Sequence, residues 1–231
     1  VDLSSSMEVD DFTDDQGRTV DRLTEVKQVL DDFLSRRQGD RVGLIVFGSS
    51  VFVQAPFTDD LDVLRSLLDE LQVGMAGPKT ALGDAIGLSM TLFENSEVDQ
   101  RVLIVLTDGN DTGSLVPPAR AAEIARDSGV IIHSVAVGDP GTVGEEKLDQ
   151  ASLQAVAEIT GGRYFFAADR DQLEQTYSEL DALNPRQVET LSFRPQRDLF
   201  QWPLGLALAL SFLFAGASVL RRRTVPAVGA A

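Results

Sequence analysis

The sequence predicts an α/β fold, with a doubly wound, mostly parallel sheet of six strands covered by helices on both faces. Short runs rich in Val, Ile and Leu alternate with stretches of helical periodicity, which is the pattern of a parallel sheet joined by helices. The apolar runs are nearly continuous, as in residues 102–106 and 130–137, and such strands are typically buried on both faces. The chain has 231 residues, enough for one domain with a sizeable core.

Six segments are predicted to be strands: residues 1–3, 41–47, 51–54, 102–106, 130–137 and 163–166. The second and third are separated only by Gly48, Ser49 and Ser50, which predicts a hairpin. The third segment is therefore expected to form one antiparallel edge strand of an otherwise parallel sheet.

Helices are predicted where apolar residues recur every three or four positions. The expected helices are residues 23–34, 61–71, 81–93, 117–127, 153–160 and 173–183. Together with the strands they make residues 1–184 one α/β domain. The chain begins inside the first strand pattern, and we expect it to be truncated at the N-terminus.

The composition excludes several classes of site. There is no cysteine, so disulfides and thiolate metal sites are excluded, and the single histidine, His133, excludes a site built from several histidines. The formal net charge is −16, and such a chain repels nucleic-acid phosphates. We therefore expect no nucleic-acid partner, but acidity suits metal ions.

Residues 199–220 carry no charge and are predicted to form a transmembrane helix. At the helical rise per residue this stretch would cross the hydrocarbon core of about 30 Å. Residues 185–198 would be a polar linker and residues 221–231 a short cytoplasmic tail, because Arg221, Arg222 and Arg223 follow the stretch. The domain would then lie outside the cytoplasm, on the periplasmic side of a bacterial inner membrane.

Oxygen-bearing side chains cluster at two predicted strand ends. The first strand runs into Asp2, Ser4 and Ser6, in a D-x-S-x-S pattern, and the fourth runs into Asp108. In a doubly wound sheet, ligands bind beyond the carboxyl ends of the strands where the strand order reverses. If these two strands flank that point, the four side chains meet in one crevice, and the loop before residue 81 can bring Thr80 to the same place.

Carboxylates and hydroxyls are hard ligands, which suit Mg²⁺, Mn²⁺ or Ca²⁺ better than zinc or copper. We predict a divalent cation, most simply Mg²⁺, held by Asp2, Ser4, Ser6, Thr80 and Asp108. Each motif alone is also compatible with a capped loop or a common turn. Their occurrence together, in this order, is more specific.

These residues resemble the metal-ion-dependent adhesion site of von Willebrand factor type A domains. The resemblance covers about residues 1–184 and is closer to the bacterial Bat-type membrane proteins of aerotolerance operons, through residues 40–48, 80–87 and 160–165. Ser5 is a departure, because the family usually has glycine between the two serines. The resemblance implies protein–protein interaction through the metal, with a partner that offers an acidic side chain. It also implies work beside a MoxR-type AAA ATPase and other Bat-type membrane proteins, in envelope or oxidative stress tolerance.

The alternative is an enzyme, a Mg²⁺-dependent phosphatase that uses Asp2 as its nucleophile. Such enzymes carry a second aspartate, a general acid, two residues after the first. Here that position is Ser4, so the sequence favours a binding module over an enzyme.

Overall fold

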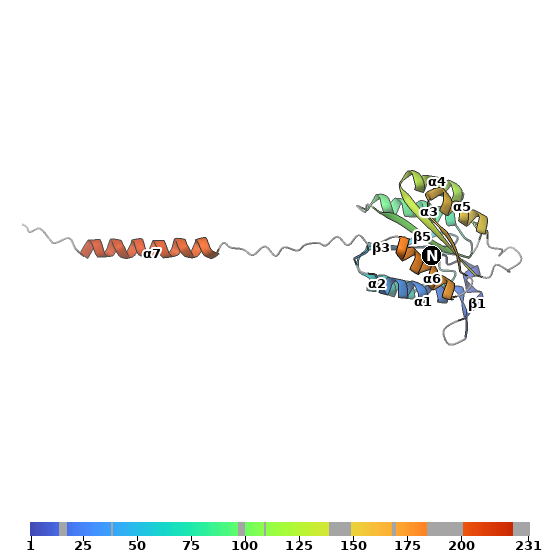
Figure 1. Ribbon diagram of the computed structural model, residues 1–231, viewed down its shortest axis with the longest axis horizontal. Helices are drawn as coiled ribbons and strands as arrows, with labels where there is room; N and C mark the ends of the chain where they lie inside the picture. The colour runs from blue at the N-terminus through green and yellow to red at the C-terminus, as the bar shows by residue number, and fades with distance from the viewer. Residues whose placement is uncertain are drawn as a thin grey trace, which may run out of the picture. The chain divides into compact units, whose positions relative to one another are not determined.

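The computed structural model describes eight segments of the chain: residues 1–13, 18–37, 39–96, 100–108, 110–138, 149–167, 170–183 and 201–223. The chain divides into two compact units, Val1–Gln187 and Val188–Ala231, each of which is treated by itself (Figure 1). The predicted linker, residues 185–198, lies outside the described residues, and so do Gly109 and residues 224–231 of the predicted tail.

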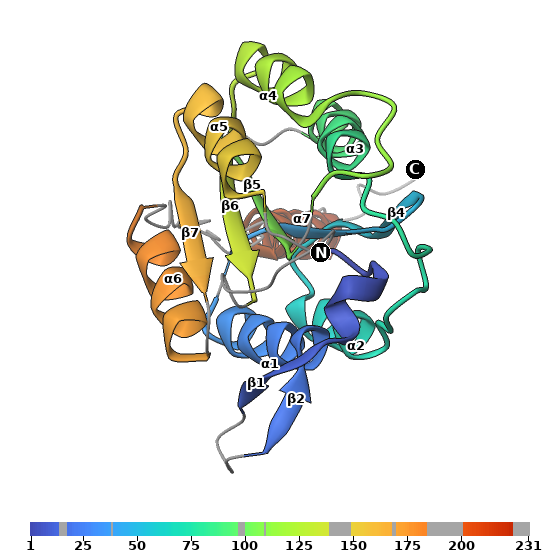
Figure 2. The same cartoon turned by 90° about the vertical axis from the view of Figure 1, so that its right-hand side faces the viewer.

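The first unit has three layers. Its helices are a short 3₁₀ helix and six α-helices: η1 (Ser5–Glu8), α1 (Arg22–Ser35), α2 (Leu61–Asp69), α3 (Leu82–Glu94), α4 (Pro118–Asp127), α5 (Gln150–Thr160) and α6 (Arg170–Leu183). In Figure 2, α3, α4 and α5 lie on one side of the strands, and α1, α2 and α6 lie on the other. Each predicted helix is therefore present, with ends within a few residues of the expected ones.

The strands are β1 (Asp10–Thr13), β2 (Thr19–Asp21), β3 (Val42–Phe47), β4 (Val51–Thr58), β5 (Arg101–Thr107), β6 (Val130–Val137) and β7 (Tyr164–Ala167). β5, β6 and β7 form a parallel sheet in that order, whereas β3 and β4 form an antiparallel pair. β1 and β2 form a separate hairpin that the sequence did not predict.

The prediction of one six-stranded sheet is wrong. The described strands form sheets of two, two and three strands, and the parallel sheet has only three. Residues 1–3 lie between β3 and β5, where Asp2 forms a single parallel bridge with Phe47 and its N–H donates to the carbonyl of Leu106 at 3.0 Å. Residues 1–3 contact both neighbouring strands, but a single bridge at Asp2 does not join β3 and β5 into one sheet.

Alternate residues of the parallel strands belong to two different hydrophobic cores, because successive side chains of a strand point to opposite faces of the sheet. Val105 and Ala136 belong to the core under α3, α4 and α5. Leu106 and Val135 belong to the core under α1, α2 and α6. The carboxyl ends of β3 and β5 are thereby buried between the two helical layers.

Strand β4 pairs only with β3 in the described part of the chain. Phe52 and Val53 on this strand are 51% and 40% exposed. Pro56 lies within the same strand and has no N–H to donate.

The second unit contains one helix, α7 (Gln201–Arg223). The prediction of a transmembrane helix at residues 199–220 is wrong: among the residues that the structure describes, no helix combines the length and the apolar character that crossing a membrane requires. α7 extends to Arg221, Arg222 and Arg223, three charged residues that lie beyond the predicted stretch.

Candidate metal site

Asp2 is fixed at the point where the first segment meets two strands. The N–H of Leu3 donates to the carbonyl of Phe47 at 2.7 Å, and the N–H of Phe47 donates to the carbonyl of Val1 at 3.0 Å. With the bond from Asp2 to Leu106, these contacts hold residues 1–3 against the carboxyl ends of β3 and β5. The side chain of Asp2 therefore lies at the predicted edge of the strands.

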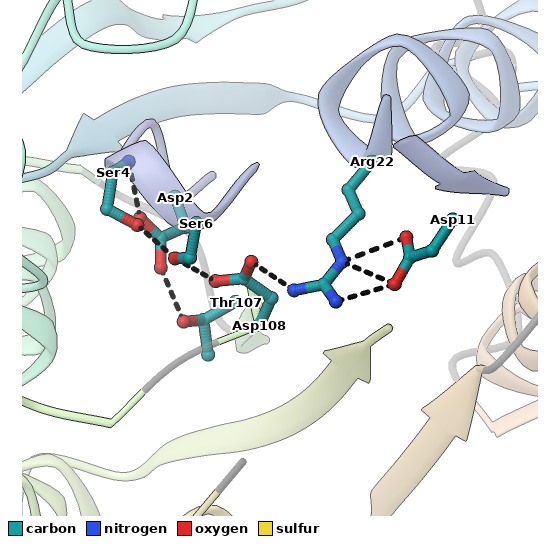
Figure 3. Close-up of polar contacts among 7 residues, drawn as sticks. All are labelled: Asp2, Ser4, Ser6, Asp11, Arg22, Thr107 and Asp108. Carbon is teal, nitrogen blue, oxygen red and sulfur yellow. Dashed lines mark hydrogen bonds and ion pairs between the residues drawn. The ribbon is translucent and has the colours of Figure 1, made fainter. Parts of the chain in front are cut away.

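The carboxylate of Asp2 is completely buried and accepts hydrogen bonds on both oxygens. Its Oδ1 accepts from the N–H of Ser4 at 2.8 Å, and its Oδ2 accepts from the hydroxyl of Thr107 at 2.5 Å (Figure 3). Thr107 is the last residue of β5, so Asp2 is hydrogen-bonded to the strand that Asp108 directly follows.

Asp108 is joined to the serines by a short chain of hydroxyls. The hydroxyls of Ser4 and Ser6 lie 3.1 Å apart, and Ser6 donates to Oδ1 of Asp108 at 2.7 Å (Figure 3). Ser6 lies in η1, whose tight turn returns its side chain toward Asp108. The structure thus brings together four of the five predicted ligands: Asp2, Ser4, Ser6 and Asp108.

Thr80 lies in a loop that packs against the serine segment through the backbone. The N–H of Ser5 donates to the carbonyl of Pro78 at 3.3 Å, and the N–H of Ala81 donates to the carbonyl of Gly48 at 2.9 Å. Thr80 is 4% exposed, but the hydrogen-bonded chain among the other four residues does not include its side chain. Its role as a ligand stays a prediction.

The loop after Asp108 holds Thr80 and the start of α3 in place. The carbonyl of Thr80 accepts from the N–H groups of Thr112 and Gly113 at 2.9 and 3.0 Å, and its own N–H donates to the hydroxyl of Thr112 at 3.1 Å. Asp111 and Ser114 accept from the first two N–H groups of α3, those of Leu82 and Gly83. Donors that would be unpaired at the start of this helix are thereby satisfied.

Burial makes both aspartates harder to ionise, and repulsion by Asp108 adds to this effect at Asp2. Burial raises the pKa of Asp2 to about 6, and the nearby charge of Asp108 raises it further, while the bonds from Thr107 and Ser4 oppose the shift. Burial also raises the pKa of Asp108, against the bonds from Ser6 and Arg22. Two buried carboxylates in one place favour the arrival of a cation.

Sequence reasoning missed Arg22, which supplies one cation from inside the protein. Its Nη1 donates to Oδ2 of Asp108 at 2.7 Å, and its Nε and Nη2 donate to Asp11 at 3.0 and 2.6 Å (Figure 3). The side chain of Arg22 is only 3% exposed. Arg22 and Asp108 are 86 positions apart, and no local pattern in the sequence signals this pair.

The donor set fits a hard divalent cation. Every candidate ligand atom is an oxygen, from a carboxylate or a hydroxyl, and such atoms suit Mg²⁺, Mn²⁺ and Ca²⁺. The guanidinium of Arg22 contacts two carboxylates, those of Asp11 and Asp108, and the carboxylate of Asp2 lies near that of Asp108, so these four side chains together have an excess of negative charge. Within the described segments, no group of three or more His, Cys, Asp or Glu side chains could hold a metal ion. A site of two aspartates completed by hydroxyls is of a different kind.

Two relatives show how far the similarity extends along the chain. An uncharacterized protein of Borreliella burgdorferi is 24% identical over an alignment of 184 positions, which covers 73% of this chain and 52% of the relative. A UPF0353 protein of Mycolicibacterium paratuberculosis is 27% identical and aligns over 98% of this chain and 70% of its own length. The chain thus spans about half of the first relative.

Solved structures share the fold. The conserved hypothetical protein BatB of Bacteroides thetaiotaomicron is 25% identical with a TM-score of 0.66, over 79% of this chain and 95% of that one. An aerotolerance-related membrane protein of Bacteroides fragilis is 24% identical with a TM-score of 0.65, over 77% and 94%. Proximal thread matrix protein 1 of the mussel byssus, in a form described as having a zinc-occupied MIDAS motif (the metal-ion-dependent adhesion site), is 20% identical with a TM-score of 0.60, over 79% and 43%.

The profile of the von Willebrand factor type A domain matches residues 1–179, which is most of the chain. The match includes Asp2, Ser4, Ser6, Thr80 and Asp108, and it ends within α6, the last helix of the first unit. The three layers and the carboxylates at the strand ends agree with this assignment, so the chain belongs to the von Willebrand factor type A domain family.

Proposed function

We propose that this domain binds a divalent cation, most simply Mg²⁺, and uses it to bind a partner protein. The observation that carries the proposal is the pair of buried carboxylates, Asp2 and Asp108, at adjacent strand ends and linked by serine hydroxyls. Burial removes both carboxylates from water, and a cation placed among these oxygens would offset the lost solvation and the repulsion between them.

Asp2, Ser4, Ser6, Thr80 and Asp108 would hold the ion. A bound Mg²⁺ supplies a Lewis-acidic centre with positions that protein ligands do not fill. Ser4 and Ser6 already direct their hydroxyls into one chain, so little reorganisation is needed to face a cation. Mn²⁺ and Ca²⁺ use the same oxygen chemistry and remain alternatives to Mg²⁺.

The partner would offer an Asp or Glu side chain to the metal. The chain's net charge of −16 repels an acidic protein at long range, so the attraction must be local. Repulsion between exposed charges is screened beyond about 8 Å at physiological salt, whereas a direct metal contact is not. We propose a MoxR-type AAA ATPase or another Bat-type protein at the bacterial inner membrane as the partner, in envelope or oxidative stress tolerance. The likeness to BatB and to an aerotolerance-related membrane protein supports the Bat-type part of this proposal.

Binding is favoured over catalysis by the environment of Asp2. A nucleophilic carboxylate must be open to a substrate, but Asp2 is completely buried. Ser4 also occupies the place of the general acid that the phosphatase alternative requires. We therefore propose an interaction module that does not turn over a substrate.

Calorimetric titration of the full chain with Mg²⁺ and Mn²⁺ tests the metal site. We expect Asp108→Ala to weaken binding on the order of 100-fold or more, since even partners outside the first coordination shell are worth about 10–100-fold. Asp127→Ala is the matched control, because it removes the same charge from an exposed position at the end of α4. Equal affinities in the wild type and Asp108→Ala would contradict the site.

The adhesive role is tested with the same proteins. Capture of a partner from membranes by the full chain should be lost in EDTA and with Asp108→Ala, and it should survive moderate salt. Association that persists unchanged in EDTA would show that any bound metal is structural.

A further inference from the structure

The guanidinium of Arg22 is buried beside the proposed metal site. Its Nη1 contacts Asp108, and its Nε and Nη2 form a fork with the two oxygens of Asp11 (Figure 3). The Asp108 side chain is completely buried, and that of Asp11 is 21% exposed. One cation is therefore shared between an inner and an outer carboxylate.

The backbone of Gly138 packs closely against the guanidinium of Arg22. Gly138 follows the last residue of β6, and its φ of +126° favours glycine. A Cβ placed there would come within 2.8 Å of Cζ of Arg22 and 3.0 Å of its Nη2. The guanidinium thus lies directly against the strand end, and its position is defined by packing as well as by charge.

Arg22 divides the oxygens of Asp108 between two uses. Oδ2 accepts from Arg22, whereas Oδ1 accepts from Ser6, on the side of the other predicted ligands. A metal ion bound through Asp108 and the guanidinium of Arg22 would draw on the charge of the same carboxylate. Two cations on one carboxylate weaken each other's attraction.

We propose that Arg22 is an internal counter-cation of the metal site, which shares Asp108 with the bound ion, and that Asp11 sets how strongly Arg22 holds Asp108. This inference rests on the proposed function, because it concerns the same site. Asp11 lies in β1 and Arg22 follows β2 directly, so the β1–β2 hairpin becomes part of the metal site. Coupling of this kind is reciprocal: a conformational equilibrium of the hairpin would change the affinity for metal by the same factor by which the metal changes that equilibrium.

Arg22→Met tests the counter-cation by thermal unfolding of the full chain with and without Mg²⁺. Methionine keeps an apolar chain of similar reach and removes the charge, which leaves Asp2 and Asp108 without an internal cation. The rise in melting temperature on adding Mg²⁺ should therefore be larger in Arg22→Met than in the wild type. An arginine with only a packing role would lower the melting temperature equally with and without metal, and that result would overturn the proposal.

Asp11→Asn gives a second measurement that does not depend on the folding of the first variant. Asparagine keeps an oxygen for Arg22 but removes the charge that draws the guanidinium away from Asp108, so Arg22 should compete more strongly with the metal. We expect the affinity for Mg²⁺ by calorimetry to fall by about fivefold or more, the lower end of typical coupling between sites. Asp10→Asn is the control, because Asp10 is exposed on the same strand and its charge is screened.

The outcomes separate this inference from the proposed function. A wild-type chain that binds no divalent cation would overturn both. A wild type that binds metal, with Asp11→Asn no different from Asp10→Asn, would overturn only the role of Arg22. The effect of Asp11→Asn should also disappear in the Arg22→Met background, since the two residues act through one contact; a full effect there would contradict the proposal.

Discussion

The two flanks of the metal site are held in different ways. On one flank, residues 77–81 and 110–116 are joined by backbone hydrogen bonds to the carbonyl of Thr80. The same flank is joined to α3 by side chains that accept from backbone N–H groups, those of Asp84, Asp111 and Ser114. On the other flank, the β1–β2 hairpin reaches the site through the fork between Arg22 and Asp11. One flank is fixed by hydrogen bonds from backbone N–H groups, and the other by the ion pairs of Arg22.

This difference indicates which parts of the site can adjust. Backbone bonds at a helix start do not depend on an ion, so the flank of Thr80 and α3 sets a constant geometry. Contacts between charged groups change whenever a neighbouring charge changes, so the hairpin flank would respond to a bound metal ion. Three further predictions test this contrast, from the largest expected effect to the smallest.

Gly83→Ala should disrupt the fixed flank most. A Cβ at Gly83 would come within 1.9 Å of the carbonyl oxygen of Val116 and 3.1 Å of the nitrogen of Pro118, and backbone atoms cannot move aside easily. We expect a loss of about 3 kcal/mol or more in the free energy of unfolding, at the upper end of overpacking effects. Urea denaturation measures this loss.

Gly87→Ala is its matched control, one turn further along α3, where a Cβ meets nothing within 4 Å. Alanine there should stabilise the helix by about 0.5–1 kcal/mol, because it restricts the unfolded chain. Equal losses in the two variants would show that the close approach at Gly83 does not hold this flank.

The pH dependence of stability tests the charges between the flanks. The pKa of Asp2 is raised from 3.8 to about 6, so its ionised form is less favourable in the folded chain than in the unfolded chain. In EDTA its contribution is full below pH 4 and is lost as the pH rises through about 6. The loss is on the order of 3 kcal/mol from the size of the pKa difference.

Urea denaturation between pH 4 and pH 7.5 should show this decline in the wild type. The comparison with Asp2→Asn isolates it, because the variant keeps every other titrating group. Saturating Mg²⁺ should remove the decline, since the metal binds the ionised carboxylate. Identical pH profiles for the wild type and Asp2→Asn would be evidence against a raised pKa of the carboxyl group at this position.

Asp84→Ala should have the smallest effect of the three. It removes the acceptor of the Leu115 and Val116 N–H groups, but Leu115 is 91% exposed, so water can replace part of what is lost. We expect about 1 kcal/mol of destabilisation, typical of one exposed hydrogen-bonded group, and an unchanged affinity for Mg²⁺. A large fall in metal affinity would show that the fixed flank also depends on charge.

Local signals were sufficient to locate the helices. Asp21, Asp60 and Asp149 each accept a hydrogen bond from an N–H group three residues later, which is the usual arrangement at a helix start. The periodicity that follows each of these residues depends only on near neighbours in the chain. For that reason the predicted ends of the helices lie within a few residues of the observed ones.

The sheet and the hairpin depended on contacts that the sequence does not encode locally. Residues 1–3 were predicted to be a strand, but their sheet pairing is a single bridge between Asp2 and Phe47, with one hydrogen bond from Asp2 to Leu106. In the hairpin, β1 and β2 pair Asp10 with Asp21, and like charges across a strand pair are normally unfavourable. Aspartate is depleted in strands, so the acidic composition of this region does not indicate the hairpin.

The candidate site was predictable because its motifs follow strand ends, where parallel strands bring their loops together. The convergence of Asp2, Ser4, Ser6 and Asp108 follows from that rule. The guanidinium of Arg22 did not follow from it, because an arginine at the first position of a helix is common and its partner is distant in sequence. Charges that balance a site are therefore harder to predict than the ligands themselves.

The edge strand β4 has a consequence for how this protein behaves at high concentration. An edge strand with exposed Phe52 and Val53 would normally recruit a strand from another molecule and begin an aggregate. Pro56 removes one of the donors that such a recruit would need, so an intermolecular ladder could not continue along the whole strand. One proline thus makes edge-to-edge growth of a sheet between copies of the chain unfavourable, although apolar side chains of the same strand are exposed.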